Sequence, residues 1–156
     1  MKGLRYLKYA LLCVYGAILI YLLFFMRMGT AQADFRVQLI PFRTLAEQIS
    51  KLVNKKPPTP SLIQLGGNTL LFVPLGLLLP WCFPTLRTWK HMALAAILME
   101  CAIELLQGIT RLGTCDIDDL ILNLLGITLG YILFQLLKRN AKEKKCVESD
   151  PHCAHR

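Results

Sequence analysis

Eight carboxyl, carboxamide or basic side chains stand in an otherwise apolar stretch between Met99 and Gly126. Such groups can exchange protons, bind cations or accept hydrogen bonds from a ligand. A charge deep in hydrocarbon costs about 2.5–3.5 kcal/mol or more, so a simple membrane anchor would avoid them. We therefore take all eight as candidate functional residues: Glu100, Glu104, Gln107, Arg111, Asp116, Asp118, Asp119 and Asn123.

The spacing of these residues predicts two polar stripes on two neighbouring helices. Spacings of four, three and four place the first set on one helical face: Glu100, Glu104, Gln107 and Arg111. Spacings of three, four, three and four do the same for the second set: Asp116, Asp119, Asn123, Gly126 and Gly130. The glycines of the second stripe let a neighbouring backbone come close. Asp118 falls off this stripe, and we set it aside.

The short connection from Gly108 to Cys115 makes the two helices an antiparallel hairpin, so the stripes can face each other. Arg111 is then a counter-charge for the carboxylates. The alternative is that the polar groups only hold helices together, at about 0.6–2 kcal/mol per bond. Helix–helix contact accounts for one or two such residues. It accounts poorly for two polar stripes at the same depth in the membrane, so we favour a functional site.

The preceding apolar segment adds further candidates to this site. Asn68 and Phe72 lie one helical turn apart, so we expect the amide to face the same pocket. Pro74 is expected to bend this helix around the pocket. Pro74, Gly76, Gly126 and Gly130 are therefore predicted to have structural roles.

Four apolar runs have the length of membrane-spanning helices. Uncharged runs cover Tyr9–Met26, Leu62–Leu86 and Leu120–Leu137, and a fourth run, His91–Ile109, contains two glutamates. A bilayer core takes about 20 residues. We predict an all-α, polytopic membrane protein that forms a compact four-transmembrane-helix bundle. Its expected parts are spans at about 8–26, 66–86, 91–109 and 117–137, an outer loop at 27–65, a single membrane domain at 1–137 and a disordered basic cytoplasmic tail at 138–156.

The distribution of lysine and arginine predicts the orientation in the membrane. With four spans, eleven basic residues fall on the side of the two termini and seven on the other side. The positive-inside rule then places both termini in the cytoplasm. Cleavage of the first span after Ala31-Gln32-Ala33, as in a signal peptide, remains an alternative. We favour a retained span, because its 18 uncharged residues exceed the roughly 7–15 of a signal peptide.

The net charge of +8 does not indicate nucleic-acid binding, because the basic residues flank the apolar runs and no zinc-finger or aromatic–basic platform accompanies them. Such flanking residues contact membrane lipids. The tail residues Cys146, His152, Cys153 and His155 do not have the spacing of a zinc module. We expect no metal and no cofactor. The sequence leaves the oligomeric state open.

The chain resembles the VanZ-like family of small bacterial membrane proteins in three segments, GNTLLFVPLGLLLP, ECAIELLQ and CDIDDLILNLLGITLG. The family pattern falls on Asn68, Phe72, Pro74, Gly76, Glu104, Gln107, Asp116, Asp119, Asn123 and Gly126. Arg111 matches a basic position of many members. Glu100 lies outside the pattern, and we assign it to helix–helix contact. The outer segment QLIPFRTL is similar to an Asn-x-x-Pro-Phe element, with Gln38 where asparagine is usual.

This resemblance implies an integral protein of the cell membrane. The family's namesake is associated with resistance to the glycopeptide antibiotic teicoplanin, without a change in the D-Ala-D-Ala ending of the peptidoglycan precursor. The expected site is an acidic pocket, open to the exterior, that binds a lipoglycopeptide or a precursor headgroup. Its expected residues are Asn68, Phe72, Glu104, Gln107, Arg111, Asp116, Asp119 and Asn123.

Two other functions remain open from the residues alone. The first is an intramembrane hydrolase or transferase that acts on a lipid-linked substrate with carboxylate or metal-assisted catalysis. No HExxH, GxSxG or phosphate-binding loop is present, so no catalytic residue is assigned and we favour a non-enzymatic function. The second is an ion-coupled transporter, although four spans are few for the usual inverted repeats.

Overall fold

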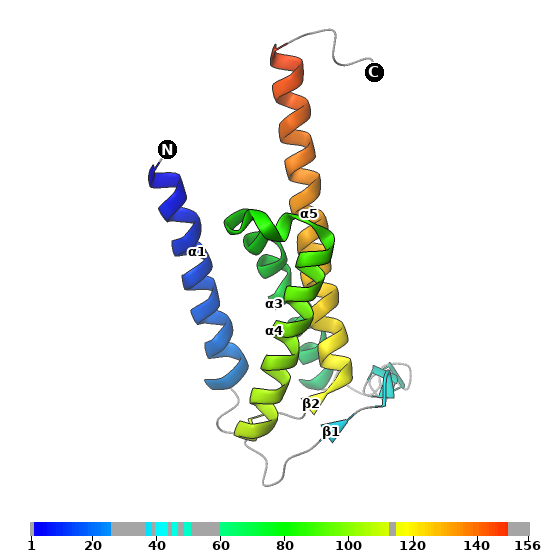
Figure 1. The fold of residues 1–156 in the computed structure, drawn as a ribbon. Helices are drawn as coiled ribbons and strands as arrows, with labels where there is room; N and C mark the ends of the chain where they lie inside the picture. The colour runs from blue at the N-terminus through cyan, green and yellow to red at the C-terminus, as the bar shows by residue number, and fades with distance from the viewer. Residues whose placement is uncertain are drawn as a thin grey trace.

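The computed structural model describes residues 2–25, 37–38, 40–43, 45–46, 49–50, 60–112 and 115–149. These residues are mostly helical, and Figure 1 shows long helices gathered into a bundle. In chain order the elements are α1 (Lys2–Ile20), the π-helical turn η1 (Tyr21–Phe25), β1 (Val37–Gln38), α3 (Pro60–Cys82), the 3-10 turn η3 (Pro84–Arg87), α4 (Trp89–Thr110), β2 (Cys115–Asp116) and α5 (Ile117–Ser149). The helical architecture that the apolar runs predict is confirmed.

Three helical segments are long and apolar enough to cross a membrane, namely Arg5–Phe25, Trp89–Thr110 and Ile117–Ala141. The described apolar part of α3, Thr69–Cys82, is shorter. Many large apolar side chains on these helices remain exposed, such as Leu98 at 62%. Soluble monomers rarely expose contiguous apolar patches larger than a few hundred Å². The chain is therefore a helical membrane protein, and the number of its spans stays a prediction.

The apolar core is shared by α1, η1, α3, α4 and α5. Its buried members are Leu19, Leu23, Phe72, Leu75, Met92, Ala96, Ile127 and Tyr131. Polar contacts add to the packing of α1 against α3, because Lys8 donates a hydrogen bond to the carbonyl oxygen of Trp81 at 3.2 Å. Tyr9 donates to the carbonyl of Cys82 at 3.3 Å. These carbonyls belong to the last turn of α3 and have no partner within the helix, so α1 completes the end of α3.

Helices α3 and α5 touch backbone to backbone, through glycines on both helices. A Cβ atom on Gly126 would collide with the carbonyl oxygen of Thr69, and one on Gly130 with that of Val73. From the α3 side, a Cβ atom on Gly76 would meet the α5 backbone in the same way. This close approach is the packing that small residues permit between membrane helices. It fixes the position of α5 and of the polar residues at its beginning.

Gly130→Ala is expected to destabilise the folded protein. The added methyl group forces α3 and α5 apart, and overpacking of this kind typically costs about 1–3 kcal/mol. The matched control is Gly16→Ala, because nothing lies within 4 Å of the Cβ position at Gly16. Thermal unfolding in detergent should show a lower midpoint for Gly130→Ala and an unchanged or higher midpoint for Gly16→Ala. Equal midpoints would contradict the close packing of α3 and α5.

Helix α5 continues beyond the predicted end of the last span. The sequence analysis assigns residues 138–156 to a disordered tail, whereas residues 138–149 are helical in the structure (Figure 1). Lysine, glutamate, alanine and arginine in this segment favour a helix. Arg139 also donates to Glu143 at 2.9 Å, an i,i+4 ion pair. Residues 150–156 lie outside the described part of the chain.

The polar end of α4 and α5 is held by two local features. Helix α4 is capped by Arg111, which has a left-handed φ of 58° and donates its backbone N–H to the carbonyl of Gly108 at 3.1 Å. Strand β1 pairs with β2 in parallel, so that Val37 lies opposite Cys115 and Gln38 opposite Asp116. Part of the segment between α1 and α3 is therefore attached to the beginning of α5.

Candidate functional site

Six polar side chains are buried where the second half of α4 meets the beginning of α5. Each is at most 9% exposed, and Glu100 is completely buried. We call these residues the carboxyl–amide cluster: Glu100, Glu104, Gln107, Asp116, Asp118 and Asn123. Four belong to the candidate set of the sequence analysis, whereas Glu100 and Asp118 were set aside from it.

Two hydrogen bonds join α4 to α5 or to the β2 strand that precedes it. Asn123 donates its side-chain N–H to Oε2 of Glu100 at 3.0 Å. The backbone N–H of Asp116 donates to Oε2 of Glu104 at 3.1 Å. Both carboxyl groups therefore use one oxygen to bind the neighbouring element. The α4 stripe faces the beginning of α5, as the helical spacing predicts.

Gln107 contacts a different part of the protein from the one expected. The sequence analysis places its amide opposite the polar residues of α5. In the structure the amide donates to the carbonyl oxygen of Leu23 at 3.3 Å. Leu23 lies in η1, where the last carbonyl groups of a helix lack partners within the helix. Gln107 therefore joins the end of the first helix to the cluster.

Asp118, which falls off the α5 stripe, has a structural contact that helical spacing does not predict. Its carboxylate accepts hydrogen bonds from the backbone N–H of Phe42 at 2.6 Å and of Leu45 at 3.2 Å. Its own backbone N–H donates to Oδ1 of Asp116 at 2.9 Å, so Asp116 caps the beginning of α5. Helical spacing within α5 predicts contacts with α4 alone, whereas the partner of Asp118 is the segment after β1. The sequence signal that could have pointed to this contact is the Pro41-Phe42 element, because Phe42 is one of the two donors.

Three buried oxygen atoms of the cluster have no hydrogen-bond donor within the described part of the chain. They are Oε1 of Glu100, Oε1 of Glu104 and Oδ1 of Asn123. A buried acceptor without a partner typically costs about 1–3 kcal/mol. Glu100 and Asn123 are bonded to each other, and Glu104 lies one turn along the same stripe of α4 from Glu100. The cluster thus offers acceptors that could receive N–H or O–H groups.

The comparisons with known proteins assign the chain to a family. A family described as VanZ/LLP1 matches residues 12–138. The chain belongs to the VanZ/LLP1 family. It is also 33% identical over 78 residues to Protein VanZ of Enterococcus faecium, a match that covers 50% of this chain. The same match covers 48% of that relative, so the chain spans about half the length of the curated protein that it matches. No solved structure matches the chain.

The VanZ/LLP1 pattern also includes positions outside the carboxyl–amide cluster. Phe72 is completely buried in the core and packs against the backbone at Gly126. Asp119 is half-buried, and Arg111 is exposed at the end of α4. The prediction that Arg111 neutralises the carboxylates stays a prediction, because its described role is to end α4. The side chain of Asn68 lies outside the described residues.

The donor atoms of the cluster are carboxylate and amide oxygens. Within the described part of the chain, no group of three histidine, cysteine, aspartate or glutamate residues could hold a metal ion. The acceptors of the cluster come from two glutamates and an amide, and each glutamate already accepts one protein hydrogen bond. This arrangement suits the binding of hydrogen-bond donors.

Proposed function

We propose that this VanZ/LLP1 protein contributes to resistance against teicoplanin, or to a related function of the bacterial cell envelope. It is a multi-pass protein of the plasma membrane with four spans and with both termini in the cytoplasm. In this orientation the carboxyl–amide cluster lies in the outer half of the membrane. Family membership and the similarity to Protein VanZ support this proposal.

The observation that carries the proposal is the set of three buried acceptors for which the described residues supply no donor. A lipoglycopeptide and a peptidoglycan precursor headgroup are both rich in peptide N–H groups, and both have amino groups. Hydrogen bonds from such donors to a carboxylate contribute about 1.5–3 kcal/mol each. The ligand would therefore satisfy Glu100, Glu104 and Asn123 in place of water.

Access to the cluster would depend on the segment after β1. This segment is attached by the pairing of β1 with β2 and by the hydrogen bonds of Phe42 and Leu45 to Asp118. Separation of the segment from α5 would break the strand pair and both hydrogen bonds to Asp118. Separation would uncover Asp116 and the adjacent Glu104.

The enzymatic alternative, an intramembrane hydrolase or transferase, stays a prediction. Its metal-dependent form would need a donor set that the described residues do not provide.

The test is the teicoplanin susceptibility of bacterial cells that express the chain. Expression is expected to raise the minimal inhibitory concentration, and substitution in the cluster is expected to remove the increase. The amount of protein in the membrane must be measured for every variant. An unchanged susceptibility at matched protein amounts would contradict the proposed role in resistance.

A further inference from the structure

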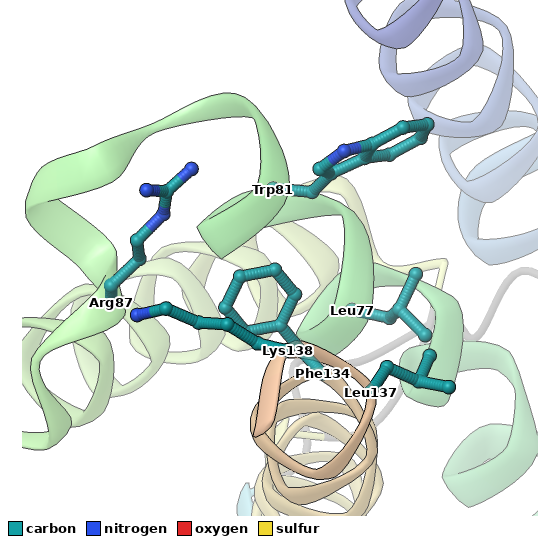
Figure 2. Close-up of a pocket in the computed structure, with 6 residues that line it drawn as sticks. All are labelled: Leu77, Trp81, Arg87, Phe134, Leu137 and Lys138. Carbon is teal, nitrogen blue, oxygen red and sulfur yellow. The ribbon is translucent and has the colours of Figure 1, made fainter. Parts of the chain in front are cut away.

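A second site lies at the opposite end of the helices from the carboxyl–amide cluster. A cavity of about 440 Å³ opens between the end of α3, η3 and the middle of α5. Its volume falls within the roughly 300–1,000 Å³ of pockets that bind small molecules. The lining residues are Leu77, Trp81, Arg87, Phe134, Leu137 and Lys138 (Figure 2). We call this cavity the basic groove.

The basic groove combines two cations with apolar walls. Arg87 and Lys138 are both half-buried. Figure 2 shows their side chains gathered on one side of Phe134, with Leu77 and Leu137 on the other. Five carboxyl groups lie on the second half of α4 and at the beginning of α5, away from this groove. On α5 beyond the groove, Glu143 binds Arg139. The residues that line the groove thus include two cations and no carboxyl group.

Arg87 is held in place from both sides. Its side-chain Nε donates to the carbonyl oxygen of Pro80 at 3.1 Å. Its own carbonyl oxygen accepts hydrogen bonds from Tyr131 at 2.7 Å and from Gln135 at 2.9 Å. These bonds fix the η3 turn against α5. A preorganised cation costs less entropy when it binds an anion than a freely rotating one.

We propose that the basic groove binds an anionic phospholipid of the membrane leaflet on this side. The phosphate group lies between Arg87 and Lys138, and one acyl chain lies against Leu77, Leu137 and Phe134. Basic pockets between membrane helices suit anionic headgroups, and the cytoplasmic leaflet is the anionic one. Trp81 also lines the groove, and tryptophan is enriched at membrane interfaces. This inference rests on the proposed orientation in the membrane, but not on ligand binding at the carboxyl–amide cluster.

The fluorescence of Trp81 provides a direct test. Trp81 and Trp89 are the two tryptophans of the chain, so Trp89→Phe leaves Trp81 as the sole reporter. The protein is placed in nanodiscs of phosphatidylglycerol and phosphatidylcholine, with brominated acyl chains on either lipid in turn. At equal mole fractions, brominated phosphatidylglycerol is expected to quench Trp81 at least threefold more strongly than brominated phosphatidylcholine.

Two substitutions and a matched control locate the preference. Lys138→Gln and Arg87→Gln are expected to bring the quenching ratio close to one. Arg139→Gln removes the same charge from the next residue, whose side chain is 76% exposed, and is expected to leave the ratio unchanged. If Arg87→Gln does not fold, Lys138→Gln and Arg87→Lys still test the proposal. Arg87→Lys keeps the positive charge, so it should keep most of the preference for phosphatidylglycerol.

Three results would overturn the proposal. Equal quenching by both brominated lipids would show that the groove has no preference for an anionic lipid. An equal loss in Arg139→Gln would assign the preference to surface charge in general. Displacement of the lipid by millimolar inorganic phosphate would show a site for the free anion, because the acyl chain would then contribute nothing.

Discussion

Glu104→Gln is expected to remove most of the increase in teicoplanin resistance while the protein still folds. Glutamine keeps an oxygen that can accept the backbone N–H of Asp116, as Oε2 of Glu104 does at 3.1 Å. It also places an N–H group at the position of Oε1 of Glu104, which receives no hydrogen bond from the residues that the structure describes. A ligand that donates to this position then meets another donor. The loss of one charge-assisted hydrogen bond, about 1.5–3 kcal/mol, corresponds to roughly 10- to 150-fold weaker binding.

The matched control for Glu104→Gln is Glu143→Gln. Glu143 lies on α5 with its side chain 60% exposed, so the same chemical change occurs there far from the cluster. Susceptibility of cells with Glu143→Gln should equal that of cells with the unchanged protein. If Glu104→Gln also retained full resistance at equal protein amounts, the carboxylate would have no part in ligand binding.

The second large effect concerns Glu100 and Asn123, and it separates a binding site from helix–helix contact. Glu100→Leu leaves both polar atoms of Asn123 buried without a partner, because its N–H group loses Oε2 of Glu100. We expect a loss of about 1–3 kcal/mol in unfolding free energy. The double variant Glu100→Leu/Asn123→Leu removes the polar pair completely. Since apolar residues of similar volume often replace a buried polar pair without loss, its stability should recover to about that of the unchanged protein.

Resistance should remain lost in this stable double variant, because two of the three acceptors are gone. The measurements are thermal unfolding in detergent and teicoplanin susceptibility, with both single variants included. A double variant that regained stability and full resistance together would assign Glu100 and Asn123 to helix–helix contact alone. A double variant as unstable as the sum of the single variants would contradict the pairing itself.

Helical spacing predicts the part of the site that depends on α4 and α5 alone. Glu104 and Asn123 face the neighbouring element because residues three or four apart share a face. The glycines of α5 were also assigned correctly to close approach, since no side chain fits between the backbones at Gly126 and Gly130. Apolar length likewise predicts the helices, because hydrocarbon requires every backbone group to be bonded internally.

Contacts with distant segments could not be predicted in this way. Asp118 lies off the α5 stripe, and its carboxylate binds the backbone N–H groups of Phe42 and Leu45. These residues are more than 70 positions away in the chain, so helical spacing gives no information about the contact. The contact of Gln107 with Leu23 could not be predicted either. The carbonyl of Leu23 is available as an acceptor only because the helix ends within η1, and the sequence does not fix that end point. Glu100 was left out because the family pattern omits it, although it is the fully buried partner of Asn123.

The central claim is that the carboxyl–amide cluster binds a ligand rich in N–H donors, and binding to the purified protein tests it most directly. Teicoplanin and a lipid-linked peptidoglycan precursor are titrated separately against the protein in nanodiscs. The comparison includes Glu104→Gln and its control, Glu143→Gln. We predict saturable binding of at least one of the two ligands, weakened about tenfold or more by Glu104→Gln and unchanged by Glu143→Gln. Absence of saturable binding for both ligands, or equal affinity in Glu104→Gln, would contradict the account.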